Sequence, residues 1–135
     1  MRVLIVEDQI TSTELLKRTL SPYGHCDVAI DGKEAIEAFC LAWEEDQPYD
    51  LICLDIIMPE MDGREVLKAI RKKEKEMGIR GLDGVTVIMT TVLADSENIM
   101  GAFRDGCEAY IVKPIDEQKL LQQVRDLGLI SLEIS

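Results

Sequence analysis

Short runs of apolar, often β-branched residues recur along this chain, and segments with apolar residues at helical spacing separate them. This alternation is typical of βαβ units, in which helices cover both faces of a parallel sheet. Five strands and five helices fill the chain. The strands are expected near residues 3–6, 27–30, 51–54, 85–89 and 109–112. The sequence therefore predicts an α/β fold with a single doubly wound, five-stranded parallel sheet.

Size and charge limit the classes of function. A chain of 135 residues with 47% hydrophobic content can bury the core of one domain. We expect that domain to span residues 1–127, followed by a short tail at 128–135 and no output domain. The formal net charge of −11 argues against nucleic acid or an anionic membrane as a direct partner, because both are polyanions.

Cysteine usage and the first residues indicate a compartment. The four cysteines are scattered, with no C-x-x-C pair, so we expect reduced thiols as in a cytosolic protein. The first apolar run has four residues, which is too short for a signal-peptide core or a membrane span. We therefore expect a cytoplasmic protein without membrane insertion.

Four of the apolar runs end at residues suited to handling a phosphoryl group. Because the carboxyl ends of parallel strands lie along one edge of a sheet, these side chains should share a cleft. They comprise three carboxylates, a hydroxyl and an ammonium, and they follow the first, third, fourth and fifth runs: Glu7, Asp8, Asp55, Thr90 or Thr91, and Lys113.

This set of side chains implies a hard metal ion. Carboxylates titrate near pH 4, and two such charges about 4 Å apart repel by roughly 4 kcal/mol at an effective dielectric constant of 20. An all-oxygen site favours Mg²⁺. Asp55 stands alone after the central strand and is the candidate nucleophile for an aspartyl phosphate. Lys113 would supply positive charge and a threonine a hydrogen bond.

Each of these residues also has a purely structural interpretation. An acid at a strand end is commonly a turn residue or a helix N-cap. Threonine is a good strand former, and Lys113 can be a solvated turn residue. The functional interpretation depends on all of them falling at the strand ends that one site needs.

Three stretches of the chain resemble a known family. They are residues 55–63 (DIIMPEMDG), the pair Glu7-Asp8, and residues 110–114 (YIVKP). On these, the chain resembles the response-regulator receiver domains of two-component signalling, especially the stand-alone CheY-like members. The resemblance covers nearly the whole chain and implies the flavodoxin-like strand order 2-1-3-4-5.

The resemblance also implies residue roles. Asp55 is similar to the phosphorylated aspartate, and Asp8 and Asp55 to direct Mg²⁺ ligands together with the backbone carbonyl of Ile57. Glu7 resembles a partner that acts through metal-bound water. Lys113 resembles the lysine that pairs with the phosphoryl group, and the bond from it to the following proline is cis in the family.

Two further positions correspond to the family's switch residues. Counting back from Lys113 without gaps selects Thr91 as the switch threonine, and Thr90 stays open as the alternative. Tyr110 falls at the switch aromatic, although a partly buried strand tyrosine fits the sequence equally well.

The chain departs from the family pattern near the site. Val92 stands where a small residue is usual, so its bulk can hinder the phosphodonor or the movement of the threonine. Ile57 and Leu93 would flank the phosphoryl group, and both are apolar where a polar side chain could orient an attacking water. We therefore predict slow self-dephosphorylation.

The resemblance implies a regulatory phosphoacceptor rather than an enzyme. Its partners would be a sensor histidine kinase or phosphotransfer protein and a downstream target, which we expect on the face formed by residues 96–127. The kinase, the target, the pathway (chemotaxis or another) and the oligomeric state, including a homodimer, stay open.

Rival functions are weaker. A haloacid-dehalogenase-type phosphatase needs a second acid two residues after Asp55, where Ile57 stands. A flavodoxin-like carrier would need a phosphate cradle, and residues 9–13 contain no glycine. A receiver-fold scaffold that works without phosphorylation is the nearer alternative.

The charged run at residues 71–76 is expected to be the solvated end of a helix.

Overall fold

A computed structural model describes residues 1–131, so the last four residues of the predicted tail lie outside the described chain. Within it, parallel strands form one five-stranded sheet in the order β2-β1-β3-β4-β5. The strands are β1 (Arg2–Val6), β2 (His25–Ala29), β3 (Leu51–Leu54), β4 (Thr86–Thr91) and β5 (Ala109–Val112). This topology confirms the predicted fold class.

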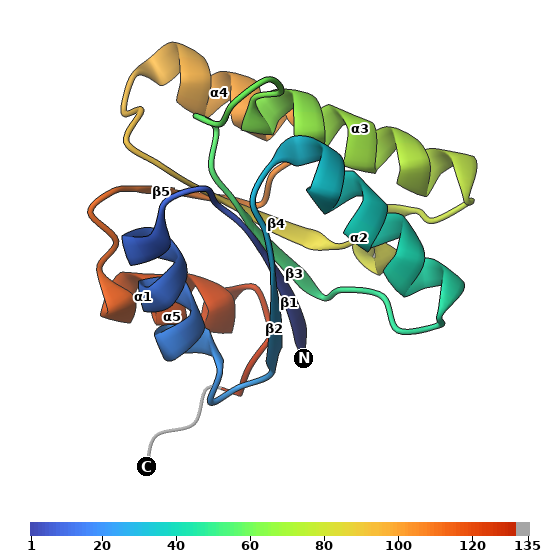
Figure 1. Ribbon diagram of the computed structural model, residues 1–135, viewed down its shortest axis with the longest axis horizontal. Helices are drawn as coiled ribbons and strands as arrows, with labels where there is room; N and C mark the ends of the chain where they lie inside the picture. The colour runs from blue at the N-terminus through green and yellow to red at the C-terminus, as the bar shows by residue number, and fades with distance from the viewer. Residues whose placement is uncertain (132–135) are drawn as a thin grey trace.

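Helices cover both faces of the sheet. Helices α1 and α5 lie on one face, and α2, α3 and α4 lie on the other (Figure 1). Their bounds are α1 (Ile10–Leu20), α2 (Gly32–Glu44), α3 (Gly63–Glu76), α4 (Ser96–Asp105) and α5 (Glu117–Asp126), with one 3₁₀ turn, η1 (Gly81–Asp83).

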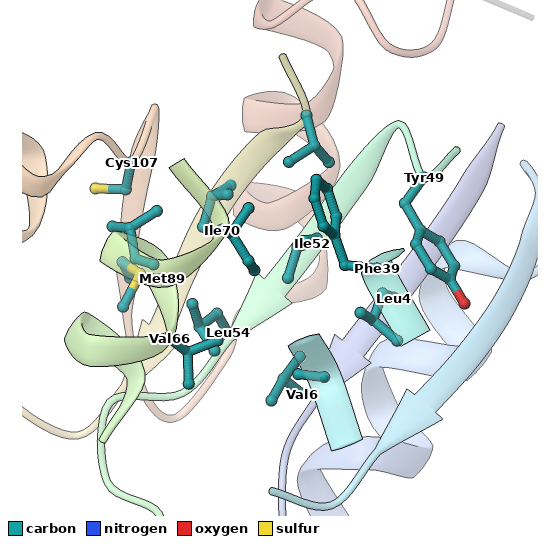
Figure 2. Close-up of a cluster of buried hydrophobic side chains, with 14 of the residues drawn as sticks. Leu4, Val6, Phe39, Tyr49, Ile52, Leu54, Val66, Ile70, Met89 and Cys107 are labelled. Carbon is teal, nitrogen blue, oxygen red and sulfur yellow. The ribbon is translucent and has the colours of Figure 1, made fainter. Parts of the chain in front are cut away.

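Side chains of the central strands alternate between two cores. Val3 and Ile5 of β1 pack with the residues of α1 and α5, whereas Leu4 and Val6 pack toward α2 and α3. Figure 2 shows the second core, where Phe39 lies among side chains from the sheet. Both faces of the central strands are therefore buried, and their ends are held in fixed positions.

Aspartates begin four of the helices. Asp31, Asp62, Asp95 and Asp116 each accept a hydrogen bond from a backbone N–H of the first turn, and Asp62 forms a capping box with Glu65. Helices α2 and α3 therefore begin at Gly32 and Gly63, directly after their caps. Helix α4 ends at Gly106, which has a positive φ.

Three sequence expectations need correction. Strand β2 begins at His25 rather than 27, and β4 continues through Thr90 and Thr91 rather than ending at 89. The charged run at 71–76 is not simply a solvated helix end. Glu74 is buried, and Arg71 donates a hydrogen bond to it at 2.7 Å.

None of the helices within residues 1–131 is both long enough and apolar enough to cross a membrane.

Candidate functional site

Three carboxylates meet beyond the carboxyl ends of β1 and β3. Val6 and Leu54 are paired neighbours in the sheet, so Glu7 and Asp55 emerge side by side. The backbone N–H of Asp55 donates to the Val6 carbonyl at 3.1 Å, which continues the ladder by one step. Glu7, Asp8 and Asp55 each offer an oxygen within 4.8 Å of the others. The structure thus brings together the acids that the sequence singled out.

Lys113, the residue directly after β5, reaches this acidic cluster. Its ammonium donates a hydrogen bond to Asp55 Oδ2 at 2.9 Å and another to Glu7 Oε1. Only 8% of the Lys113 side chain is exposed. The backbone N–H of Lys113 donates to the Thr91 carbonyl at 2.7 Å, and the bond from Lys113 to Pro114 is cis, as the resemblance implies.

The electrostatics of the cluster leave an excess of negative charge. Burial raises the pKa of Glu7, and the hydrogen bond from Lys113 opposes that shift. Burial would lower the pKa of Lys113, but the hydrogen bonds to Glu7 and Asp55 outweigh it and raise the pKa, so the ammonium stays charged. One ammonium faces three carboxylates. Their oxygens suit a hard divalent cation, so the donor set fits Mg²⁺.

The segment after Asp55 is held tightly against the site. The N–H of Gly63 donates to the Ile56 carbonyl at 2.8 Å, and the N–H of Ile57 donates to Asp55 Oδ1 at 3.1 Å. A Cβ at Gly63 would lie 2.1 Å from the Asp55 carbonyl oxygen, so only glycine fits there. The start of α3 is therefore packed directly on the backbone of Asp55.

A second group of predicted residues meets at Leu93. Thr91 is fully buried, and its hydroxyl accepts a hydrogen bond from the Leu93 N–H at 3.4 Å. The Tyr110 hydroxyl donates to the Leu93 carbonyl at 2.7 Å. The predicted threonine and aromatic thus share one backbone residue, but their switching roles stay predictions.

The other predicted positions differ in exposure. Val92 and Ile57 are 58% and 50% exposed, so neither side chain is packed into the cluster. Thr90 is fully buried, and its hydroxyl has no hydrogen-bond partner in the part of the chain that the structure describes.

Sequence reasoning missed a link between the site and α4. Arg64 follows Gly63 directly, and its Nε donates to Asp105 Oδ2 on α4 at 2.8 Å. The guanidinium lies over Gly101, where a Cβ would come within 2.3 Å of it. A glycine in mid-helix was the only sequence signal, because Arg64 and Asp105 are 41 residues apart.

Comparison with known proteins agrees with this geometry. The sequence model of the response regulator receiver domain family matches residues 3–125 of this chain. The chemotaxis protein CheY homolog of Campylobacter jejuni is 32% identical over 127 residues, which cover 94% of this chain and 92% of that protein. A probable transcriptional regulator, ycf27 of Guillardia theta, is 34% identical over 92% of this chain and 44% of its own length.

Solved structures show the same likeness. The CheX-CheY-BeF3-Mg+2 complex from Borrelia burgdorferi matches with a TM-score of 0.82 and 29% identity, covering 96% of this chain and 90% of that chain. Chemotaxis protein CheY4 of Vibrio cholerae matches with a TM-score of 0.75 and 27% identity, over 93% and 97% of the two chains. This chain belongs to the response regulator receiver domain family and is a CheY-like receiver of two-component signalling.

Proposed function

We propose that the chain is a phosphorylation switch that accepts a phosphoryl group on Asp55. The observation that carries this proposal is the convergence of Glu7, Asp8 and Asp55 with the Lys113 ammonium, which donates to Asp55 at 2.9 Å. A nucleophilic carboxylate thus has a cation in contact and two further acids beside it.

In the proposed transfer, a carboxylate oxygen of Asp55 attacks the phosphorus of a phosphohistidine on a histidine kinase or phosphotransfer protein. The new P–O bond forms as the P–N bond breaks, and the electron pair stays on the imidazole nitrogen, which takes up a proton. Lys113 stabilises the charge on the phosphoryl oxygens. Receiver domains are regulatory phosphoacceptors, so the chain would promote its own phosphorylation without being an enzyme in the usual sense.

We propose Mg²⁺ as the cofactor of this transfer, because its charge would offset the repulsion between the acids and the incoming phosphoryl group. Asp8, Asp55 and the Ile57 carbonyl would bind it directly, and Glu7 through water. The similarity to the CheX-CheY-BeF3-Mg+2 complex from Borrelia burgdorferi supports this assignment.

The output would be binding to a target protein. The phosphoryl group would draw Thr91 and Lys113 into new contacts, and Leu93 would link that change to Tyr110. The proposed target face at residues 96–127 carries exposed apolar side chains, including Met100 at 60% and Phe103 at 45% exposure. Such side chains on α4 suit a protein partner.

The phosphorylated state would be long-lived, because Ile57 and Leu93 cannot orient an attacking water. Replacing Ile57 with Asn should shorten the half-life of the phosphorylated protein, measured by loss of the mass adduct after donor removal. A wild-type half-life of seconds, or an unchanged half-life in Ile57→Asn, would refute this kinetic proposal.

The central experiment is intact-protein mass spectrometry after incubation with a small-molecule phosphodonor and Mg²⁺. We expect one phosphoryl adduct in the wild type, and none in Asp55→Ala or after chelation of the metal. No adduct on folded wild-type protein would favour the scaffold that works without phosphorylation. Repeating the test on Val92→Ala then separates that outcome from obstruction by Val92.

A further inference from the structure

The sheet places Thr90 on the same face as Asp55 and Lys113, on the strand between them. Sheet order puts β4 between β3 and β5. Cys53, Ile88 and Ile111 all pack in the core under α1 and α5. Because side chains alternate along a strand, the residues two positions later face the same side, and these are Asp55, Thr90 and Lys113.

The register fixes which residue of β4 lies at this crossing. Leu54 pairs with Met89, so the next step sets Asp55 beside Thr90, and Thr90 itself pairs with Ile111 of β5. Strands β3 and β5 are about 10 Å apart, at roughly 4.8 Å per neighbouring strand. The Lys113 side chain must therefore pass over β4 to reach Asp55, and Thr90 is the β4 residue below its path.

The Thr90 hydroxyl is an unusual group in this position. It is fully buried and unpaired within residues 1–131, although a buried polar group without a partner costs stability. A valine would fill nearly the same space without that cost. Meanwhile Lys113 uses two hydrogen bonds, to Glu7 and Asp55, and a lysine ammonium has three donors.

We infer that Thr90 is a positioning residue for Lys113, one that acts when the phosphoryl group arrives. This inference depends on the proposed function. Once Asp55 forms its ester with phosphorus, the carboxylate that held Lys113 loses its charge. The Lys113 ammonium turns to the phosphoryl oxygens. The Thr90 hydroxyl then accepts a hydrogen bond from the third N–H of that ammonium. This role is distinct from that of Thr91, whose hydroxyl already contacts Leu93.

The test measures the rate constant of adduct formation with a small-molecule phosphodonor and Mg²⁺. Thr90→Val removes only the hydroxyl, Thr90→Ser retains it, and Thr86→Val makes the same chemical change at the other end of β4. We expect an about tenfold slower reaction in Thr90→Val, the size of one hydrogen bond to a charged group. Thr90→Ser and Thr86→Val should react at the wild-type rate.

Urea unfolding of the unphosphorylated proteins supplies a second readout. Thr90→Val should have a midpoint equal to or above that of the wild type, because it removes an unpaired buried group. The inference is overturned if Thr90→Val reacts at the wild-type rate, or if Thr90→Ser is as slow as Thr90→Val. Failure of the proposed function looks different, since the wild type itself would then form no adduct.

Discussion

The two ends of the sheet both gather charged side chains, but they differ in the number of acids that face a cation. At the amino end of β4, Arg71 donates to Glu74 at 2.7 Å, to Glu108 at 2.7 Å, and to the carbonyls of Val85 and Gly106. Backbone N–H groups donate to the same two glutamates, as the Val85 N–H does to Glu74 at 2.7 Å. We call these residues, Arg71, Glu74 and Glu108, the Arg71 network.

At the carboxyl end, the cluster of Glu7, Asp8, Asp55 and Lys113 has three acids and one cation. Two backbone N–H groups donate here as well, from Asp8 to Glu7 Oε2 and from Ile57 to Asp55 Oδ1, both at 3.1 Å, so the two ends differ in charge rather than in backbone donors. Buried charge alone, or a surplus of a single charge, therefore does not mark a ligand site. The acidic cluster differs from the Arg71 network in its larger surplus, two negative charges against one, at a place where an oppositely charged ligand can enter.

The largest expected effect is at the amino end of the sheet, in the Arg71 network. Arg71→Met would leave the buried Glu74 without its cation, and breaking a buried pair costs about 3–5 kcal/mol. Urea unfolding should show that loss, whereas Lys72→Met, an exposed neighbour on the same helix, should change stability little. Equal stabilities of the two variants would mean that the Arg71 network does not hold the amino end together.

A smaller loss is expected between the two ends, where Arg64 joins α3 to α4. Arg64→Met would remove the hydrogen-bonded cation of Asp105, whose side chain is 12% exposed, and leave it only the more distant Lys68 ammonium at 3.9 Å. A loss of about 2 kcal/mol of unfolding free energy is expected for a largely buried pair of this kind. Hydrogen exchange should rise in α4 more than in α2. Uniform exchange in both helices would argue against a local anchor.

The smallest expected effect is a change in the free energy of unfolding that has opposite signs at the two ends of the sheet. Without metal, Asp8→Asn should raise the free energy of unfolding by about 1 kcal/mol, because it removes one repulsion in a largely solvated setting. Glu108→Gln, the same change in the Arg71 network, should lower it, because a charged partner of Arg71 is lost. Destabilisation by both variants, measured in urea with a chelator, would remove the proposed distinction.

Much of the fold could be predicted because the central strands are apolar on both faces. The expected range of β3 matches the structure, and all of its residues are buried. The expected range of edge strand β5 matches as well, and its alternate residues Ala109 and Ile111 are buried. Edge strand β2 was misplaced because only Ala29 in it is fully buried, and the apolar Ile30 that suggested a later end is 58% exposed. A strand with one buried residue gives a weaker pattern than β5, where buried residues alternate with more exposed ones.

The site acids and Lys113 were predictable because a parallel sheet places all its strand ends at one edge. The Arg71 network and the contact between Arg64 and Asp105 were not. Arg71 lies 37 residues from Glu108, and a run of alternating charges looks the same whether its members face water or one another. The position of Thr90 under Lys113 also needed the register between strands.

The most direct test of the difference between the two ends is the urea midpoint with and without Mg²⁺. A ligand that binds only the folded chain adds about 2.7 kcal/mol at one hundred times its dissociation constant. We predict that Mg²⁺ stabilises the wild type and Arg71→Met by the same increment, and does not stabilise Asp8→Asn or Asp55→Asn. If the urea midpoint of the wild type does not change with Mg²⁺, or if Mg²⁺ also stabilises Asp55→Asn, the assignment of the carboxyl end as the metal and phosphoryl site is contradicted.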